Sequence, residues 1–164
     1  MNIYLASGTI DYMRRLLNKH KEQNMILVQN NDTAIIIHET EGKTVFSSPR
    51  KYVVLEASGT LPAAGMVVLQ HIPVVDEEKQ SFEYGMKNRQ RLTENQPGFL
   101  AFRFLRPLQL NTYVILTAWR DQAAFEKWKS SSSFAESGIA STSTISNMFS
   151  GAPYITTYNI DEEE

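Results

Sequence analysis

The sequence contains no cysteine among its 164 residues, and it has only three histidines. The lack of cysteine excludes a disulfide framework, a thiolate metal site and a cysteine nucleophile, and it permits a reducing compartment. No apolar run approaches the ~18 residues of a membrane-spanning helix, and no signal peptide opens the chain. From these absences we expect a soluble, cytoplasmic protein without a membrane span.

An excess of positive charge is also lacking. The 16 basic and 18 acidic side chains give a net charge of −2, and the last four residues, 161–164, are all acidic. Binding to duplex nucleic acid normally needs positive charge gathered on one face, because phosphate neutralisation supplies much of the affinity. No segment has such a concentration, so we expect no nucleic-acid partner. We interpret residues 161–164 as a solubilising acidic tail.

The first part of the chain alternates short apolar runs with turn residues. Thr9 can cap a helix whose apolar residues share one face: Ile10, Met13, Leu16 and Leu17. Strands are expected at four apolar runs: 3–5, 25–28, 34–37 and 44–46. The stretch after Pro49, around residues 52–55, could be a strand or a short helix, and the flanking Pro49 and Gly59 favour the helix. Because Gly59 to Gly65 form the best boundary, we predict a small α+β domain over residues 1–62.

The second part follows a recognisable order of elements. Strands and helices are expected in this sequence: strand 66–75, helix 77–94, strand 99–108, strand 113–119, a helix capped by Asp121, and strand 154–160. The order β-α-β-β-α-β is that of the ferredoxin-like fold. We therefore predict an α+β protein in which a ferredoxin-like domain, residues 63–160, follows the smaller domain.

The three histidines have different settings. His20 follows the first predicted helix, where it would cap the end, and His38 is expected at the end of a strand. His71 lies beside Gln70 within an apolar strand, and adjacent strand residues point to opposite faces. One of these two side chains must therefore face the core or a cavity, either as a satisfied core group or as part of a ligand site.

Four motifs in the second part resemble the antibiotic-biosynthesis-monooxygenase (ABM) superfamily: Pro-Gly-Phe at 97–99, Arg-Pro at 106–107, Tyr-Val-Ile-Leu-Thr-x-Trp at 113–119 and Phe-x-x-Trp at 125–128. Ile-His-Glu-Thr at 37–40 and Gly-x-Thr-Val-Phe at 42–46 narrow the resemblance to two-domain HmoB-type heme-degrading monooxygenases and staphylococcal TRAP-type proteins. The resemblance implies an ABM domain of the dimeric α+β barrel type. It also implies an oxidoreductase that opens heme oxidatively and releases iron.

The same resemblance implies site residues. The family pattern places an asparagine on the first ABM strand, a tryptophan on the second helix and, ten residues later, a histidine that ligates iron. Trp128 matches the tryptophan, and Gln70 stands at the asparagine position, so these two are the catalytic candidates. Gly138 stands where the histidine is expected. From the residues themselves, Arg103 and Arg106 on a strand, with Lys87 and Arg89 on the preceding helix, could hold carboxylates such as propionates, although solvated charge is the simpler interpretation.

Gly138 has no side chain that could ligate iron, which leaves three alternatives open. His71 could supply the metal ligand if it faces the site. The protein could be a non-catalytic, TRAP-like heme-binding or stress-related protein. It could also oxidise a small aromatic ligand without a cofactor. An unidentified electron donor would serve the heme reaction, and either a monomeric pseudo-dimer or a homodimer is expected, with the pseudo-dimer preferred.

Overall fold

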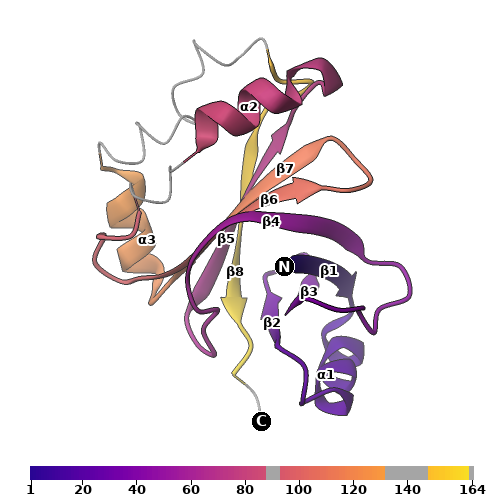
Figure 1. Cartoon of the computed structure of the whole chain (residues 1–164). Coiled ribbons are helices and arrows are strands. Elements are labelled where there is room, and N and C mark those ends of the chain that lie inside the picture. Colours follow the sequence, from indigo (N-terminus) through magenta and orange to yellow (C-terminus); the bar gives the residue numbers. More distant parts are fainter. Residues whose placement is uncertain (88–92, 132–147, 163–164) are drawn as a thin grey trace.

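The computed structural model describes residues 1–87, 93–131 and 148–162 (Figure 1). Its elements in chain order are β1 (Asn2–Gly8), α1 (Ile10–Lys19), β2 (Met25–Gln29), β3 (Ala34–Thr40), β4 (Arg50–Gly59), β5 (Met66–Pro73), a 3₁₀ turn (Asp76–Glu78), α2 (Lys79–Met86), β6 (Phe99–Pro107), β7 (Thr112–Trp119), α3 (Gln122–Lys129) and β8 (Tyr154–Ile160). As expected, Thr9 caps α1 by accepting from the Tyr12 amide, and Asp121 caps α3 by accepting from the Ala124 amide.

The strands named above close into one barrel in the order β1-β3-β2-β8-β5-β7-β6-β4. Every pairing is antiparallel, and β2 with β8 and β4 with β6 join the first part of the chain to the second. Read around the barrel, the order β4-β1-β3-β2 is followed by β8-β5-β7-β6, so both parts have the same internal strand order. The barrel thus closes within one chain, as the pseudo-dimer prediction requires, while the oligomeric state and the boundary at residue 62 stay predictions.

The interior of the barrel is an apolar cluster drawn from both parts, including Ile3, Val28, Leu69 and Leu105. These residues alternate with residues that point outwards, as the period of a strand requires. A buried ion pair crosses the same interior. The Arg103 guanidinium on β6 donates from Nε to Glu39 Oε2 on β3 at 2.5 Å.

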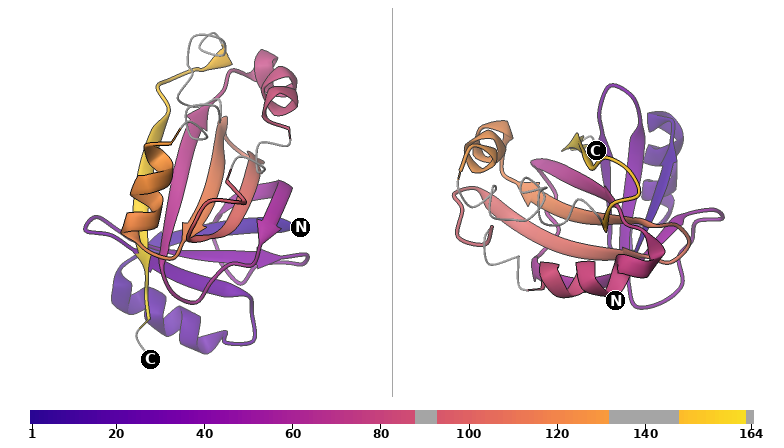
Figure 2. Two further views of the ribbon diagram at one scale, coloured as in Figure 1. Left: turned by 90° about the vertical axis from the view of Figure 1, so that its left-hand side faces the viewer. Right: turned by 90° about the horizontal axis from the view of Figure 1, so that it is seen from above.

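The helices cover the outside of the barrel. α1 packs on the outer face of β2 and β3 through Met13, Leu27 and Ile36. α2 and α3 cover the outer face of the second part, at a distance from α1 (Figures 1 and 2). No helix among the described residues is long and apolar enough to cross a membrane.

Three local predictions were wrong. Residues 50–59 form strand β4 instead of a helix, because Tyr52 contributes to the barrel interior and the strand pairs with both β1 and β6. Residues 44–46 are not a strand, and Phe46 instead packs against the α1 cluster. The helix expected over 77–94 is the shorter α2, which ends at Met86, and residues 88–92 lie outside the described part.

Candidate functional site

The outer face of β5 beneath α2 and α3, which we call the helix-side face, carries the residues Met66, Val68, Gln70 and Ile72. The alternate residues of the strand, such as Leu69, point into the barrel. Gln70 lies between Ile115 of β7 and Ile155 of β8 in the strand register. This apolar setting leaves the Gln70 side chain 2% exposed.

The carboxamide oxygen of Gln70 is the unusual feature of this face. It is buried, and no described residue donates a hydrogen bond to it. A buried polar atom without a partner costs about 1–3 kcal/mol, and such atoms in native proteins call for an explanation such as a ligand or an ordered water. Gln70 therefore marks the point on the helix-side face where a ligand with a hydrogen-bond donor would gain most.

Trp128 approaches the same face from α3. Its ring stacks on Trp119 of β7 with the ring centroids 5.0 Å apart, and it belongs to the cluster that includes Val68, two residues before Gln70. The Trp119 indole in turn donates to Thr117 Oγ1 at 2.9 Å. The structure thus brings the two catalytic candidates, Gln70 and Trp128, to one face, with Trp128 buried among aromatic rings.

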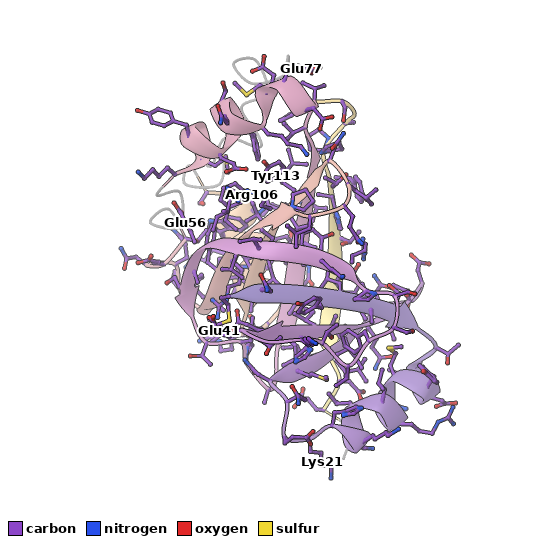
Figure 3. All side chains as sticks on the ribbon, turned by 45° about the vertical axis from the view of Figure 1, so that its right-hand side comes forward. Lys21, Glu41, Glu56, Glu77, Arg106 and Tyr113 are labelled. Carbon is purple, nitrogen blue, oxygen red and sulfur yellow. The ribbon has the colours of Figure 1, made fainter. Side chains whose placement is uncertain are left out.

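A polar cluster fixes α2 over this face. Arg106 on β6 forms a paired salt bridge with Glu83 on α2, from Nε to Oε2 at 2.9 Å and from Nη2 to Oε1 at 2.7 Å. The Tyr113 hydroxyl on β7 donates to the same carboxylate. Figure 3 shows Arg106 and Tyr113 side by side beneath α2.

The electrostatics of this cluster follow from its contacts. The hydrogen bond from Arg106 holds the pKa of Glu83 below its usual value, so the carboxylate is charged at neutral pH. Burial, and next the Glu83 carboxylate, raise the pKa of Tyr113. Glu83 and Tyr113 were not predicted as site residues from the sequence. The one indication in the sequence is that Glu83 follows Phe82, which was expected on the inner side of the helix.

The predicted propionate contacts are less defined. Lys87 is exposed just beyond the end of α2, where its amide bonds to the Tyr84 carbonyl at 3.3 Å. Arg89 and Gly138 lie outside the described residues. The roles assigned to these three positions stay predictions.

His71 lies on the other side of the sheet. Its Nε2 is 2.9 Å from Thr156 Oγ1, and its ring stacks on Tyr154 with the centroids 4.4 Å apart. Burial, and next the charge of Arg50, lower the pKa of His71 to about 4, so the ring is neutral at pH 7. Because it points towards the barrel interior, His71 is not brought together with Gln70 and Trp128, and the packing offers it no route to a ligand on their face.

The other two histidines are also remote from the helix-side face. His20 caps the C-terminal end of α1. His38 is fully buried within β3 instead of ending a strand, and its ring nitrogens contact Thr44 Oγ1 at 3.0 Å and Gln23 Oε1 at 3.1 Å. All three histidines of the chain are therefore placed elsewhere, and a histidine-ligated heme does not fit the helix-side face. No group of three His, Cys, Asp or Glu among the described residues could hold a metal ion.

The chain is similar to known proteins over most of its length. Residues 65–137 match the family model described as antibiotic biosynthesis monooxygenase. The chain is 26% identical over 136 residues to the signal transduction protein TRAP of Staphylococcus epidermidis, and the aligned region covers 83% of this chain and 81% of that protein. It is also 26% identical over 129 residues to a heme-degrading monooxygenase of Listeria monocytogenes, covering 79% and 77% of the two chains.

A solved structure, described as a major regulator of staphylococcal pathogenesis, has the same fold. It superposes with a TM-score of 0.87 at 24% identity, and the match covers 100% of both chains. The resemblance inferred from the motifs is therefore confirmed, and so is the ferredoxin-like α+β barrel. Residues 65–137 are thus similar to the antibiotic biosynthesis monooxygenase family, and the strands β5, β6 and β7 within that range belong to the barrel that the N-terminal strands complete.

Proposed function

We propose that this protein is a heme-monooxygenase-like protein that takes heme, or a flat ring system of similar shape, as its ligand on the helix-side face. The observation that carries the proposal is the unpartnered carboxamide oxygen of Gln70, on the same face as Trp128. The similarity to a heme-degrading monooxygenase of Listeria monocytogenes supports heme as the ligand class.

Each side chain has a distinct part in this proposal. Gln70 Oε1 accepts a hydrogen bond from a pyrrole N–H of an iron-free ring, or from a water molecule that enters with hemin, because hemin has no N–H donor of its own, and this bond removes the cost of the unpartnered oxygen. The stacked rings of Trp119 and Trp128 supply the apolar wall that a flat ligand needs. The salt bridge between Glu83 and Arg106 holds α2 in place over the sheet, so that the wall on that side is fixed before the ligand arrives.

The placement of the histidines separates two forms of binding. A ligand held through an iron–imidazole bond would require iron, whereas a ligand held by ring packing and the Gln70 carboxamide does not. We therefore expect hemin and iron-free protoporphyrin IX to bind with affinities within about tenfold of each other, so that their binding free energies differ by less than about 1.4 kcal/mol. We also expect His71→Ala to leave the absorption spectrum of the hemin complex unchanged.

The experiment is a titration of the full chain with hemin and with protoporphyrin IX, followed by absorbance and by quenching of tryptophan fluorescence. Gln70→Ala should weaken both ligands, while Gln29→Ala, a matched change outside the helix-side face, should not. Absence of any spectral change at stoichiometric concentrations would refute the proposal. Addition of ascorbate under air then tests turnover: loss of the Soret band marks a heme-degrading enzyme, and a persistent band marks the non-catalytic, TRAP-like alternative.

The absence of histidine from the helix-side face favours a second candidate, oxidation of a small aromatic compound without a metal. Such a reaction needs a site that positions an ionisable ring and admits oxygen, and it needs no axial ligand. Oxygen uptake with a polycyclic phenol in the presence of a chelator tests it. Uptake that depends on Gln70 would favour this candidate, and no uptake above the protein-free rate would remove it.

A further inference from the structure

The two parts of the barrel correspond element by element. Because the strand order β4-β1-β3-β2 repeats as β8-β5-β7-β6, β1 occupies in the first part the place that β5 occupies in the second. α1 connects β1 to β2 as α2 connects β5 to β6. The segment 41–49 connects β3 to β4, where the segment that contains α3 connects β7 to β8.

This correspondence gives the helix-side face a structural counterpart in the first part of the chain. The helix-side face is the outer face of β5 between α2 and α3, so its counterpart is the outer face of β1 between α1 and segment 41–49. The structure has a hollow of about 410 Å³ at that place, which we call the N-terminal pocket. It is lined by Ala6 and Ser7 of β1, by one side of α1, and by residues 45–48.

The hollow lies beside segment 41–49, which is irregular instead of helical. Phe46 packs edge-on against the ring of His38 with the centroids 5.7 Å apart, and this contact holds the segment over the sheet. The Phe46 amide also donates to Thr44 Oγ1 at 3.3 Å. α1 packs mainly on β2 and β3, so the space beside β1 stays open between the helix and the segment.

The chemistry of the lining indicates the kind of ligand. Met13, Leu16 and Phe46 provide an apolar wall, and Tyr12 adds a second aromatic ring. Lys19 gives the described lining a positive charge at one end, and His20 lies beside it. No carboxylate is part of this lining. The Glu22 side chain is 67% exposed, its Oε1 lies 3.8 Å from His20 Nδ1, and it is not part of the lining.

We propose that the N-terminal pocket binds a small amphipathic anion, an aromatic carboxylate of one or two rings. The volume lies within the range of about 300–1,000 Å³ that is usual for small-molecule sites. The ring of such a ligand packs against Leu16 and Phe46, and its carboxylate faces Lys19 and His20. This proposal does not rest on the function proposed for the helix-side face.

The test uses 2-naphthoate as the probe and the full chain, with binding followed by titration calorimetry and by the NMR signal of the Met13 methyl group. We expect one molecule to bind and the methyl signal to shift. Lys19→Gln should weaken binding about three- to tenfold, as expected for a charged partner near the surface. The matched control is Lys21→Gln, because Lys21 lies past the end of α1, points away from the barrel in Figure 3 and is not part of the lining.

A second variant fills the space. Ala6→Leu places extra methyl groups in the hollow and should abolish binding, with the folded state checked by circular dichroism, and Ser48→Leu serves if that variant does not fold. Failure of 2-naphthoate to bind, equal weakening by Lys19→Gln and Lys21→Gln, or unchanged binding to the filled variant would each overturn the proposal. Gln70→Ala should leave 2-naphthoate binding intact, so failure here is distinguishable from failure at the helix-side face.

Discussion

The most informative single change is Gln70→Met, because it removes the unpartnered oxygen while keeping the length of the side chain. Gln70 is 2% exposed, and its Oε1 accepts no hydrogen bond from the described residues. Removing such an unpartnered buried atom should stabilise the folded state by about 1–3 kcal/mol. Replacing the side chain by one of similar volume should destabilise the folded state by less than about 1.5 kcal/mol. We therefore expect the unliganded variant to be more stable than the wild type, by about 1 kcal/mol.

The assay is urea unfolding followed by tryptophan fluorescence, and it has an internal control. In Gln29→Met the same atoms are lost from a side chain whose Nε2 donates to Asp161 Oδ1 at 3.1 Å. That variant should be destabilised by about 1.5–3 kcal/mol, the usual net worth of a hydrogen bond to a charged group, because the Asp161 carboxylate also pairs with Arg14. If Gln70→Met loses as much stability as Gln29→Met, Gln70 is satisfied in the free protein and the argument for a ligand at this position fails.

Three further predictions concern stability. Glu39→Gln leaves the buried Arg103 without its counter-charge and should cost about 3–5 kcal/mol in urea unfolding, whereas Glu41→Gln, at an exposed ion pair, should cost less than about 1 kcal/mol. Because the pKa of His71 is about 4 when folded and about 6.5 when unfolded, only the unfolded state gains a proton as the pH falls below about 6.5. The free energy of unfolding should therefore fall by about 2 kcal/mol between pH 7 and pH 5. In His71→Gln this fall should be absent, and a variant with the same pH profile as the wild type would contradict the prediction. Glu83→Gln should loosen α2 and lower the free energy of unfolding by about 1 kcal/mol, a value reduced because the ion pair is partly exposed. The readout is proteolytic cleavage within residues 79–87. A variant as resistant to the protease as the wild type would show that the salt bridge does not hold the helix.

The sequence was sufficient for the order of elements in the second part, because strong apolar runs and capping residues mark them. It was not sufficient for β4, where Tyr52 and Val53 can be read as a helix or as a strand. The barrel decides between the two, because β4 has to pair with β1 on one side and with β6 on the other. Pairing between residues so far apart in the chain leaves no local signal.

The candidate site, like the fold, could be predicted from the sequence only in part. The alternation of a strand correctly placed Gln70 and His71 on opposite faces, but the choice of face depends on which side the helices cover. The pairing of Glu83 with Arg106 and Tyr113 joins three elements and could not be read from any one of them. His38 was expected at a strand end, and it is buried because α1 and Phe46 cover the outer face of β3.

The central claim is that the helix-side face holds a flat ligand without a histidine. The most direct measurement is a side-by-side titration of the wild type and His71→Ala with hemin and with iron-free protoporphyrin IX. The account predicts that both ligands bind both proteins with affinities within about tenfold of each other. Binding of hemin alone, or loss of hemin binding in His71→Ala, would contradict it.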